Sequence, residues 1–104
     1  MNYNIVTVNI IKNCGQSFFA DGTALTELIV QLTQVRKNNV KIILQLSVWG
    51  NLSYDVARYY QTDDYIIIEG YISIRNSNLA QTINLIDKQI EISVFKVYPL
   101  LLKS

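Results

Sequence analysis

The architecture follows from two neighbouring stretches, SVWGNLSYDVARYY at residues 47–60 and DYIIIEGYI at residues 64–72. The first begins with strand-forming residues and continues with helical spacing, whereas the second alternates like a strand. Together they predict a strand, a short helix at about 52–60 and a second strand.

The predicted helix has signals at its start and along one face. Ser53 is placed to cap it, and Asp55 is placed in the first turn, where a negative charge is favourable. The spacing of its apolar residues places them in one stripe along the helix. The members of this stripe are Leu52, Val56 and either Tyr59 or Tyr60.

Further strands and turns are expected on both sides of these stretches. The five expected strands cover about residues 3–12, 24–34, 40–49, 65–75 and 89–98. The expected turns are Asn13-Cys14-Gly15, Ala20-Asp21-Gly22 and residues 36–39. Pro99 is expected to end the last strand. The ambiguous run between residues 75 and 89 is interpreted as a protruding hairpin.

Alternation assigns the faces of the third and fourth strands. Trp49 and Tyr71 are expected on the outer, polar faces, where Glu69 also lies. The expected inward residues are Ile42, Leu44, Leu46, Val48, Ile66, Ile68, Gly70, Ile72 and Ile74. A helix between strands three and four of five is the order of the OB-fold, a Greek-key barrel. The sequence therefore predicts an all-β domain that occupies residues 1–104 as one unit.

The composition argues against several classes of function. The net charge is +1, so nucleic-acid binding would depend on local patches and stacked rings. Cys14 is the only cysteine and there is no histidine, which leaves no metal-ligand spacing, no thiol–imidazole pair and no internal disulfide. We therefore expect no catalysis, no cofactor and no metal. No apolar run is long enough to span a bilayer.

The central motifs resemble those of the bacterial and organellar single-stranded DNA-binding proteins. The resemblance rests on Trp49-Gly50-Asn51-Leu52, on Ala57 and Tyr60, and on Glu69-Gly70. It extends over most of the chain. It implies an OB-fold whose groove holds a DNA strand, with a base stacked on Trp49, and a homodimer or homotetramer.

The chain departs from this family at several positions. Ile43 stands where another stacking aromatic is usual, and no aromatic occurs between Asn76 and Gln89. Thr62-Asp63-Asp64 replaces a basic, glycine-containing turn; Asp tolerates the left-handed conformation that such a turn needs. The acidic tail of the family and an import leader are not written in the sequence. The richness in Ile, Asn, Lys and Tyr fits a plastid-encoded protein or one of the bacterial cytoplasm.

Two functional hypotheses remain open. The first is single-stranded DNA binding in replication or repair, with RNA as an open alternative ligand. Its expected contact residues are Trp49, Tyr71, Lys41, Arg36, Lys37 and Arg75. The second is a diverged OB-fold module for protein interaction and oligomerisation with weak or no DNA binding. Tyr3, Tyr54, Tyr59 and Tyr60 are expected to pack rather than to stack on bases.

Overall fold

The computed structural model describes residues 2–33, 42–76 and 88–101, and it contains five strands and one helix. The elements in chain order are β1 (Asn2–Phe18), β2 (Ala24–Leu32), β3 (Ile43–Trp49), α1 (Asn51–Tyr59), β4 (Tyr65–Asn76) and β5 (Lys88–Leu101). The predicted third turn, at 36–39, and most of the predicted hairpin between 75 and 89 lie outside the described residues.

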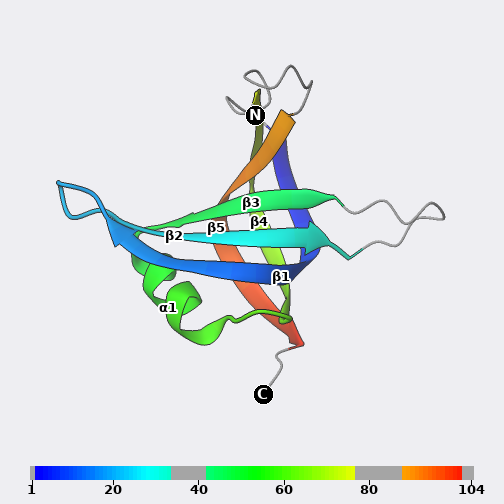
Figure 1. Ribbon diagram of the computed structural model, residues 1–104, viewed down its shortest axis with the longest axis horizontal. Coiled ribbons are helices and arrows are strands. Elements are labelled where there is room, and N and C mark those ends of the chain that lie inside the picture. The colour runs from blue at the N-terminus through cyan, green and yellow to red at the C-terminus, as the bar shows by residue number, and fades with distance from the viewer. Residues whose placement is uncertain (1, 34–41, 77–87, 102–104) are drawn as a thin grey trace.

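The strands form a closed barrel in the order β1-β2-β3-β5-β4, with β4 returning to β1. All neighbouring pairs are antiparallel except β3 and β5, which run parallel over four residue pairs. Helix α1 lies between β3 and β4 in sequence, and it packs beside the β1 and β2 strands at one side of the barrel (Figure 1). The prediction of a five-stranded OB-fold barrel is confirmed.

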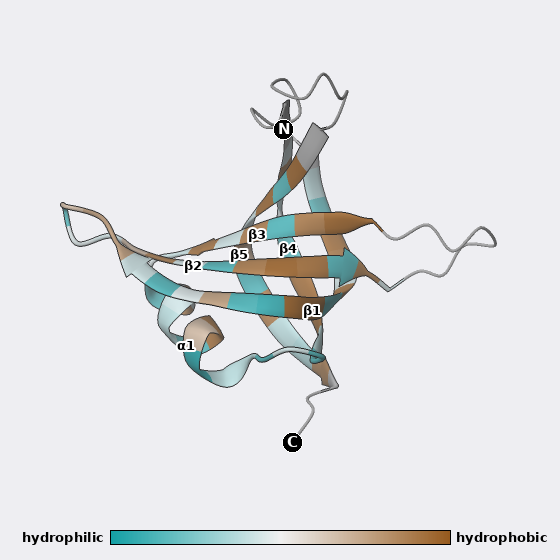
Figure 2. Ribbon diagram, in the orientation of Figure 1, coloured by the Kyte–Doolittle hydropathy of each residue, from teal (hydrophilic) through white to brown (hydrophobic). Residues whose placement is uncertain are grey.

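Alternating residues of the strands fill the barrel. Leu44, Leu46 and Val48 of β3 and Ile66 and Ile68 of β4 are buried, as predicted. Figure 2 shows apolar residues recurring along β2 and β3 where these strands run side by side. The remaining core residues are Val8, Ile10, Leu28, Val30, Val56, Ile92 and Val94.

Ile42 is a correction to this pattern. It precedes β3 and is 41% exposed, so the inward assignment was wrong. The regular alternation begins only at Ile43, the first residue of β3, although the Ile42 carbonyl still accepts from the Leu32 N–H at 3.1 Å.

The start of α1 differs from its prediction. The helix begins at Asn51, and its N-cap is Gly50, whose φ of 71° is a conformation that favours glycine. Ser53 lies inside the helix and is buried; its hydroxyl donates to the Gly50 carbonyl at 2.6 Å. Asp55 lies beyond the first turn. The predicted cap at Ser53 and the predicted dipole contact of Asp55 were therefore wrong.

The apolar stripe of α1 is confirmed, and the structure shows which of Tyr59 and Tyr60 belongs to it. Val56 is fully buried, and Leu52 and Tyr60 pack against the core. Tyr59 is 56% exposed. Tyr60 therefore closes the stripe, and the helix covers the barrel with one face only.

Strand β1 is longer than predicted, because Asn13-Cys14-Gly15 is not a turn but a bulge within the strand. The register of β1 against β2 shifts between Asn13 and Gln16, and Gly15 has φ 87°. The Asn13 side chain accepts from the Gly15 N–H at 2.8 Å and donates to the Tyr60 carbonyl at 2.8 Å. The turn-forming residues thus bend the strand and tie it to the end of α1.

Pro99 lies within β5, opposite Ile66, so the prediction that it ends the last strand was wrong. Strand β5 pairs with β3 only over Glu91–Val94, and beyond that it pairs with β4. Proline lacks an N–H, and a strand paired on one side tolerates this loss.

The turn between α1 and β4 conforms to its prediction. Asp63 adopts φ 76°, the left-handed conformation expected of this position. The N–H of Asp63 donates to the Ile10 carbonyl at 2.8 Å, and the buried Asp64 carboxylate accepts from the Gln61 N–H at 2.7 Å. Among the described residues, no helix has the length and apolar content to cross a membrane.

Candidate nucleic-acid interface

The predicted contact residues divide into a described and an undescribed group. Trp49 and Tyr71 are described, and both point outward with about equal exposure, 41% and 40%. Arg36, Lys37 and Lys41 lie outside the described residues. Arg75 belongs to β4, but its side chain is not described. The two rings can therefore be placed on the barrel, whereas the DNA contacts of the four cationic residues remain predictions.

Trp49 is the last residue of β3 and has Phe19 as its ring neighbour. The two ring centroids lie 5.4 Å apart with an interplanar angle of 71°. Phe19 precedes the Ala20-Asp21-Gly22 turn, and it is 50% exposed. Both rings are thus on the surface, in edge contact with each other.

Trp49 and Tyr71 lie on the same outer surface of the barrel, on either side of β5. Ser47 of β3 pairs with Ser93 of β5, and Ser93 pairs with Tyr71 of β4. Trp49 stands two residues beyond Ser47 and shares its face, since side chains alternate along a strand. The structure therefore places both predicted rings on one surface without bringing them into contact.

A second aromatic group surrounds Tyr71. Its ring centroid lies 5.9 Å from that of Tyr3 and 5.4 Å from that of Phe95, and Tyr3 and Phe95 are 5.5 Å apart. We call these three residues the Tyr3 cluster. All three are between 40% and 49% exposed. Tyr3 was predicted to pack, and it does so only against other surface rings.

Tyr54, Tyr59 and Tyr60, which lie in helix α1 or directly after it, differ from one another in burial. Tyr60 packs against the core, as predicted. Tyr54 and Tyr59 are 49% and 56% exposed, so neither ring is packed in the core. The Tyr54 ring contacts Phe18 at 6.1 Å, and Arg58 Cζ lies 5.8 Å from the Tyr59 ring centroid.

Glu69 lies beside the Tyr3 cluster and is held by two phenols. Its carboxylate accepts hydrogen bonds from the hydroxyls of Tyr3 and Tyr98, the latter at 2.6 Å. These bonds, with Tyr3 as the larger cause, hold the pKa of Glu69 below its usual range. The same bond raises the pKa of Tyr3 to about 12. Glu69 is therefore charged at neutral pH, which disfavours a phosphate next to it.

Further carboxylates occupy the middle of the outer surface. Glu27 accepts from the Gln45 amide at 2.6 Å, and Glu91 accepts from the Ser47 hydroxyl at 2.8 Å. The lysine and arginine side chains within the described part of the chain are all exposed, and they are Lys12, Arg58 and Lys96. The carboxylates of Glu27 and Glu91 would repel a phosphate backbone from the centre of this surface.

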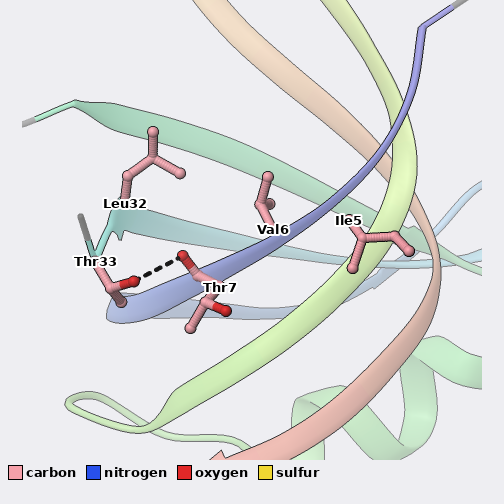
Figure 3. A pocket seen from close by; sticks show the side chains of 5 residues that line it. All are labelled: Ile5, Val6, Thr7, Leu32 and Thr33. Carbon is pink, nitrogen blue, oxygen red and sulfur yellow. Dashed lines mark hydrogen bonds between the residues drawn. The ribbon is translucent and has the colours of Figure 1, made fainter.

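One hollow lies apart from the Trp49 region. Its volume is about 260 Å³, and it lies between the N-terminal half of β1 and the end of β2 (Figure 3). The Thr33 hydroxyl donates to the Thr7 carbonyl across it at 3.3 Å. Its lining residues are Ile5, Val6, Thr7, Leu32 and Thr33. This uncharged lining offers no group that would hold a phosphate.

Within residues 3–33, 42–73 and 90–100, no cluster of three or more histidine, cysteine or acidic residues could hold a metal ion. Cys14 is a free, exposed thiol in the β1 bulge.

Sequence reasoning missed Phe19 and Phe95 as parts of the outer surface. Phe19 carried a usable signal, because an aromatic residue directly before a glycine-containing turn is poorly placed for the core. The sequence signal for Phe95 was weaker. This residue lies next to the register shift of β5 against β4, which the sequence does not reveal.

Comparison with known proteins places these features in context. No protein-family model matches the chain. A protein of Trieres chinensis named "Putative single-stranded DNA-binding protein ycf41" is 46% identical over 105 residues, which span 100% of this chain and 93% of that protein.

Two solved structures share the fold at low sequence identity. The SSB domain of a Synechococcus sp. protein superposes with a TM-score of 0.71 at 20% identity and covers 94% of each chain. The second single-stranded DNA-binding protein (SSBb) of Mycobacterium smegmatis superposes with a TM-score of 0.73 at 19% identity, over 96% of this chain and 87% of that one.

Proposed function

The chain belongs to the single-stranded DNA-binding protein family of its Trieres chinensis relative, and we propose that it binds single-stranded DNA on the outer surface of its barrel. The role is one of replication or repair and requires no catalysis. We propose a plastid location, which the ycf name of the relative and the richness in Ile, Asn, Lys and Tyr support.

The observation that carries the proposal is the position of Trp49. Its indole is exposed at the end of β3, on the outer surface of an OB-fold. Single-strand binding without sequence preference needs flat rings for the bases and cations for the backbone. Trp49 supplies a ring, and Tyr71 is proposed as a second one. Arg36, Lys37, Lys41 and Arg75 are proposed as the phosphate contacts.

The alternative function, a protein-interaction module without DNA binding, is not favoured. Its support is the neutral net charge and the missing stacking residue at Ile43. The name of the 46% identical relative supports DNA binding instead.

The salt dependence of binding tests the proposal. Each neutralised phosphate of a single strand contributes about 0.7 to the slope of log K against log salt, so the four proposed cations predict a slope no steeper than about three per bound monomer. The measurement is the anisotropy of a dye-labelled poly-dT oligonucleotide between low and moderate salt, with a labelled duplex of the same length as control. Equal affinity for duplex and single strand would contradict the proposal.

We further propose that the protein is a homodimer or homotetramer whose interface buries Tyr3, Phe95 and Ile5. Tyr3 and Phe95 are 49% and 41% exposed, and Ile5 beside them is 60% exposed. Contiguous exposed apolar side chains on a sheet are typical of interfaces. Two exposed rings and an aliphatic side chain on one face therefore support self-association.

The variant Phe95→Asp is expected to lower the molar mass in solution to that of the 11.9 kDa monomer, because it buries a charge in the interface. Light scattering after size exclusion measures the mass, and Phe18→Asp is the matched control at an exposed ring outside the cluster. An unchanged oligomer in Phe95→Asp would contradict this interface. Tyr71→Ala tests whether Tyr71, which lies beside Tyr3 and Phe95, serves the DNA, since loss of DNA affinity at unchanged mass assigns it to the DNA.

A further inference from the structure

We propose that Phe19 and Trp49 together form a nucleobase subsite, in which a base stacks on the indole and meets the Phe19 ring at its edge. The inference rests on the proposed function and extends it to a residue that neither the motif nor the comparisons assign. Its motivating observation is the contact of two exposed rings from separate elements, 5.4 Å apart.

Phe19 is not explained by packing in the core. It is 50% exposed, it follows the last residue of β1, and it does not belong to the buried cluster that fills the barrel. A large apolar side chain held half in water loses about half of the free energy that burial would give. Its ring contact is with Trp49, which is itself a surface residue. The pair is therefore suited to being covered by a ligand.

The turn that carries Phe19 is held in one conformation. The Phe19 N–H donates to the Thr23 carbonyl and the Gly22 N–H donates to the Phe19 carbonyl, each at 2.9 Å. The Thr23 N–H donates to the Asp21 carboxylate at 2.9 Å, and Gly22 has φ 89°, which suits glycine.

The same turn is connected to the Trp49 strand. Leu25 pairs with Trp49, and the Gly50 N–H donates to the Ala24 carbonyl at 2.9 Å. The backbone at Phe19 and that at Trp49 are thus tied to each other before any ligand binds. Such preorganisation lowers the conformational entropy lost on binding.

The angle between the rings defines how a base would fit. At 71° and 5.4 Å the rings touch and form a corner, so a base cannot enter between them. A base lying flat on the indole is nearly perpendicular to the Phe19 ring, and this edge-to-face arrangement is favourable for aromatic pairs. Every base offers a flat π-face, so the corner accepts bases without sequence preference.

Phe18 provides a matched comparison within the chain. It is the neighbour of Phe19, it is 57% exposed, and its ring contacts Tyr54 at 6.1 Å rather than Trp49. Adjacent residues at a strand end point to opposite faces. Phe18, the last residue of β1, therefore resembles Phe19 in size and exposure but lacks the contact on which the inference rests.

The test is the affinity of the full chain for a dye-labelled dT oligonucleotide at low salt, measured by anisotropy. We expect Phe19→Ala and Phe19→Leu each to weaken binding by about fivefold, which corresponds to the loss of one edge-to-face aromatic contact. Phe19→Tyr keeps the ring, and Phe18→Ala leaves the corner intact, so both should stay within about twofold of the wild type.

The outcomes distinguish this subsite from the general function. If Phe19→Ala and Phe19→Leu bind like the wild type while Trp49→Ala is weakened, the subsite is overturned and DNA binding on Trp49 stands. Equal losses in Phe18→Ala and Phe19→Ala would also overturn it, because the effect would belong to the turn as a whole. If the wild type does not bind the oligonucleotide, the proposed function itself fails.

Discussion

Replacing Gly70 with alanine is expected to lower the free energy of unfolding by about 3 kcal/mol or more. Gly70 lies in β4 and pairs with Val94 of β5, next to a register shift. A Cβ at this position would overlap the backbone carbonyl oxygen of Ser93 and lie 2.8 Å from Ile92 Cγ2. Since the oxygen belongs to the paired strand, it cannot move away without disturbing the β4–β5 ladder.

Urea denaturation followed by tryptophan fluorescence measures this loss, because Trp49 is the only tryptophan. Gly22→Ala is the matched control: a Cβ there meets nothing within 4 Å, and only the φ of 89° is unfavourable. Its expected cost is about 1 kcal/mol. A loss in Gly70→Ala no larger than that in Gly22→Ala would contradict the close approach of β4 and β5.

Replacing Trp49 with alanine is expected to weaken single-stranded DNA binding by about 5- to 150-fold, the range that corresponds to about 1–3 kcal/mol for one stacked base. The indole is 41% exposed and contributes to the surface rather than to the core. Folding should therefore persist in the variant. Trp49→Phe keeps a flat ring and should retain most of the affinity.

Calorimetric titration with a dT oligonucleotide measures this loss directly and needs no tryptophan signal. Tyr59→Ala is the control, because it removes another exposed ring from the neighbouring helix α1. We expect its affinity to remain within about twofold of the wild type. A folded Trp49→Ala variant that binds as tightly as the wild type would contradict the role of the indole.

The elements that the sequence predicted best are those with strong alternation. Leu44, Leu46, Ile66 and Ile68 are buried where the period of two placed them, since one-residue slips would expose a whole face. The helix position was correct within one residue. The fold could be predicted because local pattern and burial agree over these segments.

The failures lie where turn-forming residues serve another purpose. Asn13-Cys14-Gly15 has the composition of a turn, yet it forms a bulge because Asn13 binds the end of α1. Pro99 is compatible with β5 because β3 no longer pairs there. Both outcomes depend on a distant element, which local composition cannot reveal.

The candidate site was only partly predictable for the same reason. Strand periodicity was enough to direct Trp49 and Tyr71 outward. The neighbours of these rings, Phe19 and Phe95, come from the β1–β2 turn and from β5, and only the folded barrel brings them close. The cations at positions 36, 37, 41 and 75 stay predictions from the sequence.

The most direct test of DNA binding on Trp49 is a titration of the wild-type protein with poly-dT at low salt, followed by tryptophan fluorescence. Stacking of a base on the single indole should quench the emission in proportion to bound DNA. Added salt should reverse the quenching, because phosphate contacts contribute to the affinity. Unchanged emission at saturating poly-dT would contradict the account.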